Sequence, residues 1–236
     1  MKTKLITLLV CIFCFSFTIR VVAEKERRNV SSFTEISLRV PGKLYFEQGS
    51  SHSLEIEAKS STLEKIETDV RNGELIIKFE KESFFWRNFN PGEIEIHVTS
   101  PEIEKLAVSG SGDIIANSGI ITDNMALAIS GSGDIKIAKL QAGRVKASIS
   151  GSGDILIDDG GTADDLSVSI SGSGDVNTSG FEARDVSVKV SGSGNSRVYA
   201  TDNLDIRVAG SGDVYYHGSP NIDSSVSGSG SVKKIR

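Results

Sequence analysis

The chain of 236 residues contains few of the residues that build disulfides, metal sites and catalytic triads. Its two cysteines, Cys11 and Cys14, lie in a segment that has the pattern of an export signal, so the mature chain is expected to have no disulfide and no cysteine-bound metal. Its three histidines, His52, His97 and His217, are scattered, and no Ser/His/Asp set accompanies them. The scarcity of these residues argues against a catalytic centre.

The first 23 residues have the pattern of a signal peptide. Lys2 and Lys4 give a positive start, an apolar stretch covers 5–19, and small residues at 21–23 precede a charged segment. The apolar stretch is short for a membrane span, although a retained anchor is the alternative. Loss of this segment with Arg20 moves the net charge from −5 to −8, which argues against nucleic-acid binding. We expect an exported protein in the periplasm, on the outer membrane surface or outside the cell, with no transmembrane span in the mature chain.

One phrase, Ser-Gly-Ser-Gly-Asp or a near copy, repeats along the second half of the chain. Successive copies start 18 to 21 residues apart. The seven copies start at Ser109, Ser130, Ser150, Ser171, Ser191, Ala209 and Ser227. Self-similarity at a fixed period of this size is typical of a solenoid, in which each unit buries its apolar side against its neighbours.

Apolar and polar residues alternate strictly around each copy, which is the pattern of a half-buried strand. Before each phrase three apolar columns recur, and they begin at Met125, Val145, Leu166, Val186, Leu204 and Ile222. Strands repeated every 20 residues or so and stacked about 4.8 Å apart form a β-solenoid. The sequence therefore predicts an all-β fold, a single-stranded parallel β-helix with coils of about 18–21 residues. The connection on the other side of each coil varies in length, so we expect loops there.

The glycines of the phrase have two interpretations: a tight turn with positive φ, or an extended corner in which both glycines face inward. We favour the corner, because the alternation runs through the phrase without a change of phase. This interpretation predicts that Ser130, Ser132 and Asp134 point to solvent in three adjacent ladders.

Three segments are expected: a signal peptide at 1–23, an irregular β-rich cap or set of opening coils at 24–106, and the regular solenoid at 107–236. In the cap, Asn72-Gly73 between two strand-like segments predicts a hairpin. The segment 38–46 is similar to a degraded copy of the repeat, although a separate β-sandwich is the alternative. The last coil, 227–236, is protected only by Lys233, Lys234 and Arg236, or it pairs with another subunit, so a homo-oligomer is possible.

The export signal, the β-rich start that ends in Ile-Glu-Ile-His-Val-Thr-Ser-Pro at 94–101, and the tandem copies of Ser-Gly-Ser-Gly-Asp together resemble one family. The chain resembles the putative auto-transporter adhesin head GIN-domain family, whose members are exported proteins found largely in Bacteroidetes. The resemblance covers nearly the whole mature chain. It implies a β-helical fold and an adhesin-like surface role, and it implies no catalytic residues.

A column of aspartates is the first candidate site. Its members are Asp113, Asp134, Asp154, Asp175 and Asp213. Neighbouring carboxylates about 4.8 Å apart repel by roughly 0.9 kcal/mol even in water, so something should relieve them. A Ca²⁺ ion is one candidate, because it prefers carboxylate and backbone oxygens. The alternative is that each carboxylate accepts hydrogen bonds from nearby backbone or serine groups, with no cofactor.

An aromatic segment is the second candidate site. Phe84, Phe85, Trp86 and Phe89 lie within six consecutive residues between two strand-like segments. An exposed loop of this kind could stack on a sugar or enter a membrane interface. Alternatively, these side chains fold back and cover an end of the solenoid.

Taken together, the sequence predicts an adhesin-like binding protein without catalytic activity, whose partner is a glycan or a surface protein. One alternative is a β-helical carbohydrate-active enzyme, either a polysaccharide lyase or a hydrolase. A scaffold that contributes only shape is the other.

Overall fold

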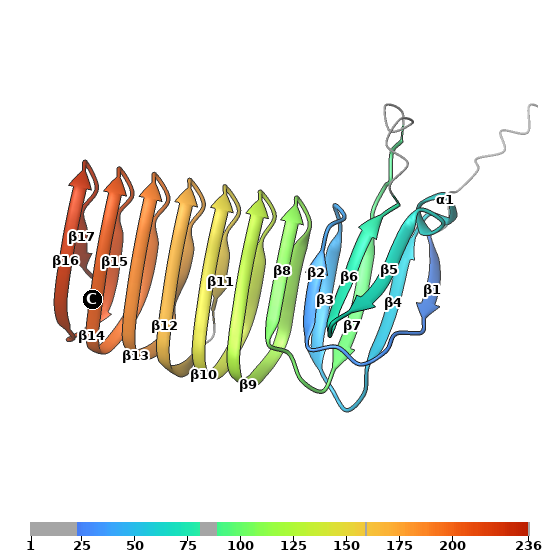
Figure 1. Ribbon diagram of the computed structural model, residues 1–236, viewed down its shortest axis with the longest axis horizontal. Helices are drawn as coiled ribbons and strands as arrows, with labels where there is room; N and C mark the ends of the chain where they lie inside the picture. Colours follow the sequence, from blue (N-terminus) through green and yellow to red (C-terminus); the bar gives the residue numbers. More distant parts are fainter. Residues whose placement is uncertain (1–22, 81–88, 159, 236) are drawn as a thin grey trace, which may run out of the picture.

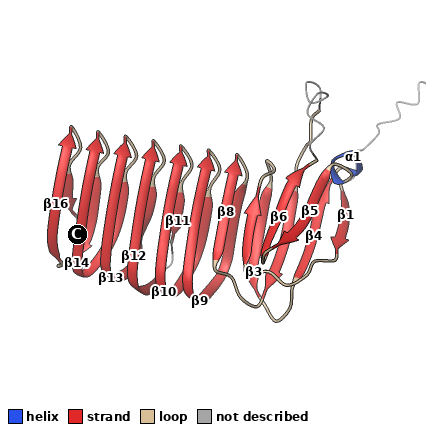
Figure 2. Ribbon diagram, in the orientation of Figure 1, coloured by secondary structure: helices blue, strands red, loops and turns tan. Residues whose placement is uncertain are grey.

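The computed structural model describes residues 23–80, 89–158 and 160–235. In them the chain is an all-β solenoid of about six turns. The strands stack side by side along the long axis, with the N-terminal strands at one end and the C-terminal strands at the other (Figure 1). Most of the described chain is strand, and α1 (Ser60–Leu63) is a single short helix at the N-terminal end (Figure 2). The predicted signal peptide lies outside the described residues, except for its last residue.

The regular coils stack in parallel and in register. Ile129 lies beside Ile149 in the next coil, and Ile149 lies beside Ile170 in the coil after that. The strands are β8 (Lys105–Gly110), β9 (Asp113–Gly131), β10 (Ile135–Gly151), β11 (Ile155–Ile157), β12 (Gly161–Gly172), β13 (Val176–Gly192), β14 (Ser196–Gly210), β15 (Val214–Gly218), β16 (Asn221–Gly228) and β17 (Val232–Lys234). The predicted parallel β-helix is confirmed.

The apolar columns face the interior, as the alternation predicts. Met125, Leu127 and Ile129 are each no more than 3% exposed, and the equivalent residues of the next four coils are also buried. The last described coil differs, because no other described coil covers its outer side: Ile222 and Val226 on β16 are 44% and 40% exposed. Burial in this fold depends on having a neighbour on both sides.

The repeated phrase forms one edge of the solenoid, the motif edge, where the chain passes from one sheet layer to the other. Ser130 and Ser132 are exposed and Asp134 is half-buried, so the predicted outward direction of these side chains is confirmed. The preference for an extended corner without positive φ is wrong in part. Gly133 faces inward, but Gly131 has a φ of 134°. Both backbone amides that follow Gly131, those of Ser132 and Gly133, donate to the Gly110 carbonyl at 2.8 and 3.1 Å.

The opposite edge of each coil was expected to consist of loops, and this expectation is wrong for several coils. β9 and β10 run continuously around this edge and stay paired with each other. Coils of different length stay paired through local register shifts, such as the one between Ile137 and Lys139. Because strands continue around it, the opposite edge presents outward side chains at regular spacing.

The first coils use the same architecture with other residues. Their elements are β1 (Glu24–Arg28), β2 (Glu35–Leu38), β3 (Lys43–Gln48), β4 (Ser53–Ala58), β5 (Ile66–Arg71), β6 (Glu74–Phe79) and β7 (Glu95–Ser100). β2 and β3 form a coil that stacks in parallel on β8 and β9, and Gly42 between them accepts a hydrogen bond from the Asp113 amide at 2.8 Å. β6 and β7 stack in parallel on the other side of β2 and β3. All described strands therefore belong to one continuous sheet.

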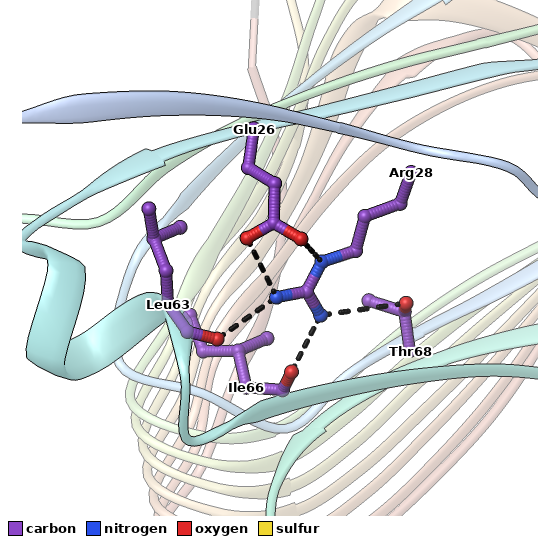
Figure 3. Close-up of polar contacts among 5 residues, drawn as sticks. All are labelled: Glu26, Arg28, Leu63, Ile66 and Thr68. Atoms are coloured by element: carbon purple, nitrogen blue, oxygen red, sulfur yellow. Dashed lines mark hydrogen bonds and ion pairs between the residues drawn. The ribbon is translucent and has the colours of Figure 1, made fainter.

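Antiparallel strands close the N-terminal end. β4 pairs with β7 and β1, and β5 pairs with β6 through the predicted hairpin, whose turn residues Asn72 and Gly73 have φ values of 53° and 80°. Arg28 on β1 reaches across this end and donates to the carbonyl oxygens of Leu63 and Ile66, while Glu26 holds its guanidinium (Figure 3). Only 14% of the Arg28 side chain is exposed. The arginine therefore supplies hydrogen-bond donors to backbone carbonyls at the N-terminal end of the stack, where a neighbouring coil would otherwise supply them.

The C-terminal end has no such closure within the described residues. Every residue of β16 is exposed, and β17 carries Lys233 and Lys234. Arg236 lies outside the described residues. Pairing of this edge with a second copy stays a prediction.

Candidate functional site

The aspartate column forms a row of side chains along the motif edge. The Oδ1 atom of Asp113 accepts the backbone N–H of Asp134 at 3.1 Å, and the Oδ1 atom of Asp134 accepts that of Asp154 at 3.0 Å. Asp154 and Asp175 are joined in the same way at 2.8 Å. These amides lie where the strand ladder is interrupted, between the end of one strand and the start of the next. Each carboxylate therefore supplies the acceptor that the corner amide of the next coil needs.

The row continues through Asn195, which shows that the acceptor does not have to be charged. Asn195 accepts the Asp213 amide through Oδ1 at 3.0 Å, in the same geometry as the aspartates. The pKa of Asp213 is lowered, first because the Ser231 hydroxyl donates to it, and further because the Tyr215 hydroxyl and the Ser231 amide donate as well. Lys233 lies 3.5 Å from the same carboxylate.

The hydrogen bonds of the row give the aspartates a structural role. Among the described residues, no three His, Cys, Asp or Glu side chains are grouped so as to hold a metal ion. Calcium binding by Asp113, Asp134, Asp154, Asp175 and Asp213 stays a prediction.

The aromatic segment lies mostly outside the described residues, which include Phe89 but not Phe84, Phe85 or Trp86. The half-buried Phe89 ring packs edge-on against Phe79 at 5.8 Å between ring centroids. The Lys65 ammonium lies 4.7 Å from the centre of the same ring. Phe89 therefore packs against the end of β6, and ligand binding by the other three aromatics stays a prediction.

A groove that was not predicted from the sequence runs along the edge of the solenoid opposite the motif edge. Three adjoining hollows of about 530, 620 and 460 Å³ form it, and Arg144 and Asp165 line both the first and the third. We call it the corner groove. Two rows of outward side chains from β9, β10, β12, β13 and β14 flank its longest part: Asn124, Arg144, Asp165, Asp185 and Asn203 in one row, and Ala126, Lys146, Ser167, Ser187 and Asp205 in the other.

The strand periodicity explains why these residues line a groove. Arg144 and Lys146 stand on either side of the buried Val145, so both side chains point outward and the strand backbone between them forms the floor. The same arrangement recurs in each neighbouring coil because the strands stay in register. Five coils at a spacing of about 4.8 Å make the groove roughly 19 Å long.

Charge is distributed unevenly along the groove. Arg144 and Lys146 are exposed, and neither makes an ion pair with another described residue. Asp165 lies beside Arg144 in the next coil, and Ser167 lies beside Lys146. The first hollow is acidic at both ends, with Glu104 at one end and Asp185 and Asp205 toward the other, and Arg144 and Lys146 on β10 are the cations in its lining. Arg184, which lines the third hollow, is ion-paired with Asp164 and Asp185.

The acidic end of the groove is held by hydrogen bonds. The Asn203 amide donates to Asp185 at 2.6 Å, and Arg184 donates to the same carboxylate at 3.1 Å. These two donors, Asn203 first, lower the pKa of Asp185. Asp185 is therefore a fixed anion with two protein partners, which does not suit a general acid.

The sequence contained a signal for the groove. The residues of the first row directly precede the first buried column, and they are all polar or charged: Asn124, Arg144, Asp165, Asp185 and Asn203. Loops were expected on this side, and alternation does not predict where the side chains of a loop point, so the row was not predicted. Once β9 and β10 are known to run around the edge, the period of two places these side chains in one row.

No histidine lies in the groove. His97 stacks on Tyr45 at 5.2 Å between ring centroids, His217 lies against Tyr199 at 5.8 Å, and His52 contacts Ser100. In the described part of the chain, no helix is long and apolar enough to cross a membrane. The fold and the site thus define a β-solenoid that offers an open, elongated surface groove.

The comparisons with known proteins place the chain in a family. Residues 32–220 match the family described as "Putative auto-transporter adhesin, head GIN domain", so the chain belongs to this family and the resemblance found in the sequence is confirmed. No curated protein matches the chain.

Three solved structures from Bacteroidetes are similar to it. A protein described as a putative adhesin from Bacteroides fragilis is 26% identical, with a TM-score of 0.84 over 90% of this chain and 97% of that one. A protein described as a putative lipid binding protein from Parabacteroides distasonis is also 26% identical, with a TM-score of 0.74 over 91% and 97% of the two chains. A putative adhesin from the same organism, 23% identical with a TM-score of 0.71 over 90% and 97%, shows the fold alone. None of these descriptions names an enzyme.

Proposed function

We propose that the protein is an exported binding protein of the adhesin type, without catalytic activity, and that the corner groove is its binding surface. It would act in the periplasm, on the outer membrane surface or outside the cell, with a glycan or a surface protein as partner. The observation that carries the proposal is the groove itself, because it is open along its length and spans five coils. Its outward side chains are mostly polar, and many of them are exposed, so they are available to a partner.

The family supports a binding role and no particular ligand. Adhesin descriptions for the family and for the neighbour from Bacteroides fragilis agree with binding rather than catalysis. The lipid-binding description of the Parabacteroides distasonis neighbour makes vesicles a useful second probe.

The alternative is a carbohydrate-active enzyme that uses carboxylates of the same groove. A glycoside hydrolase of the usual kind needs one carboxyl group with a raised pKa to act as general acid. The pKa of Asp185 is lowered, so this carboxylate does not suit the role of general acid. Incubation with a panel of polysaccharides separates the two functions, because an enzyme must release shorter products.

The proposal is tested with a variant that fills the groove. In Ser167→Trp a bulky side chain replaces an exposed serine in the middle of the second row, and aromatic residues are tolerated well in strands. Ser191→Trp, on the same sheet layer at the motif edge, makes the same change outside the groove. Binding of both variants and of the unchanged chain is measured on immobilised polysaccharides, cells and vesicles, with Ca²⁺ and with a chelator.

We expect Ser167→Trp to lower affinity at least about tenfold, which is about 1.4 kcal/mol, and Ser191→Trp to leave it unchanged. Equal binding by both variants would exclude the groove as the binding surface.

A further inference from the structure

We infer that the ligand of the corner groove is a linear glycan that carries widely spaced carboxylate groups, and that Arg144 and Lys146 hold one of these carboxylates. The inference rests on the proposed function of the groove. The observation behind it is a pair of cations that face each other across the groove on β10 without an ion-pair partner among the described residues.

The spacing of this pair suits a carboxylate. Arg144 and Lys146 are two residues apart on one strand, so their backbones are separated by about 6.6 Å. Both side chains are long and exposed, and they can converge on one anion above the groove floor. A guanidinium binds a carboxylate through two parallel hydrogen bonds, while an ammonium contributes a point charge. Together they form a two-sided clamp.

The shape of the groove indicates an extended ligand that lies along the solenoid axis. A groove of roughly 19 Å is far longer than one sugar, and each coil repeats the same outward positions at a spacing of about 4.8 Å. This spacing is close to the length of one sugar residue in an extended chain. A linear glycan can therefore offer similar groups to successive coils.

The rest of the lining indicates sugar hydroxyls rather than a densely charged polymer. Amide and hydroxyl side chains such as Asn124, Ser167 and Asn203 can donate to and accept from hydroxyl groups. Asp165 and Asp185 in the same groove repel additional anions, so nucleic acid and heavily sulfated chains are disfavoured. The two rows also contain no aromatic or large aliphatic side chain, which a peptide partner would normally require; the exposed Ile121 lines the second hollow and lies outside the rows. A glycan with few charges fits all three features.

The test compares two oligosaccharides of equal length: one with a uronic acid at every second sugar, and one entirely neutral. Their affinities are measured by calorimetry for the unchanged chain and for Arg144→Ala/Lys146→Ala. The matched control is Lys139→Ala/Lys189→Ala, which removes the same charge from exposed positions outside the groove. Thermal melting confirms that both double variants remain folded.

The unchanged chain should bind the acidic oligosaccharide and prefer it over the neutral one. Arg144→Ala/Lys146→Ala should weaken acidic binding at least tenfold and abolish the preference, whereas the control should change it less than twofold. The inference is overturned if neither oligosaccharide binds, or if both bind equally and the double variant changes nothing. Should the neutral glycan bind equally and Ser167→Trp abolish its binding, the groove would stand as the binding surface and the carboxylate clamp would fall. Acidic binding that survives Ser167→Trp unchanged would overturn both proposals.

Discussion

Replacing Asp154 by alanine and by asparagine separates the two roles that an aspartate of the motif edge can have. Its Oδ1 atom accepts the Asp175 amide at 2.8 Å, and its own amide donates to Asp134. Both substitutions remove the charge, but only asparagine keeps an acceptor at this position. Asn195 already occupies the equivalent position in a later coil and accepts an amide in the same way.

The two roles, charge and hydrogen-bond acceptor, predict different changes in the free energy of unfolding. Two like charges about 4.8 Å away cost roughly 0.9 kcal/mol each in water, and salt lowers this cost. Loss of that repulsion in Asp154→Asn roughly offsets the weaker hydrogen bond of a neutral acceptor, so its free energy of unfolding should stay within about 0.5 kcal/mol of the unchanged chain. Asp154→Ala leaves the Asp175 amide without its acceptor and should be about 1 kcal/mol less stable than Asp154→Asn.

The assay is denaturant unfolding of the three proteins, together with thermal melting in Ca²⁺ and in chelator. For a chain of this length, 1 kcal/mol corresponds to about 2–4 °C in Tm. The hydrogen-bond account predicts that the chelator changes Tm by less than about 1 °C. It is refuted if asparagine destabilises as much as alanine, or if the chelator lowers Tm of the unchanged chain well beyond this limit. Either result would favour a calcium ion bound to the charged row.

Three further predictions concern stability. Arg28→Ala should lower the free energy of unfolding by about 2 kcal/mol, because two backbone carbonyls lose a charged donor. Arg27→Ala is the control: 88% of the Arg27 side chain is exposed, so its loss should lower the free energy of unfolding by less than about 0.5 kcal/mol. Denaturant unfolding checks both variants. The pKa of Asp213 is lowered in the folded chain, so this carboxylate contributes its full stabilisation above the ordinary pKa near 3.8 and loses it as pH falls below that value. In Ser231→Ala the free energy of unfolding, measured from pH 6 to pH 2, should therefore fall less at acidic pH than in the unchanged chain. Gly133→Ala would bring a methyl group within 1.9 Å of the Gly112 carbonyl oxygen, so it should lower Tm by more than about 5 °C in a melting experiment, and an unchanged Tm would contradict the close approach of coils at the motif edge.

The repeat made the solenoid predictable because each coil must satisfy the same packing. The columns that begin at Met125 and Val145 alternate with a period of two, and this period determines which residues are buried wherever both neighbours are present. The exceptions are physical. Ile222 follows the same pattern but is 44% exposed, because among the described residues no coil stacks on the outer side of β16. The sequence pattern does not show where stacking ends. The positive φ of Gly131 also escaped prediction, since a glycine can adopt either conformation without changing the alternation.

The candidate site was less predictable than the fold. The aspartate row could be located from the repeat, but its partners could not, because the Asp154 amide meets a carboxylate of the previous coil only after the coils stack in register. The corner groove depends on strands that continue around the opposite edge, and the variable spacing there indicated loops. The sequence therefore showed that Arg144 and Lys146 are charged, but it did not predict that both side chains line one groove.

The most direct test of the central claim is a crystal structure of residues 24–236 soaked with the alternating uronic acid oligosaccharide. The account predicts density for an extended sugar chain along the corner groove, with a carboxylate between Arg144 and Lys146. Density at the aspartate row or at the aromatic segment around Trp86, with an empty groove, would contradict it.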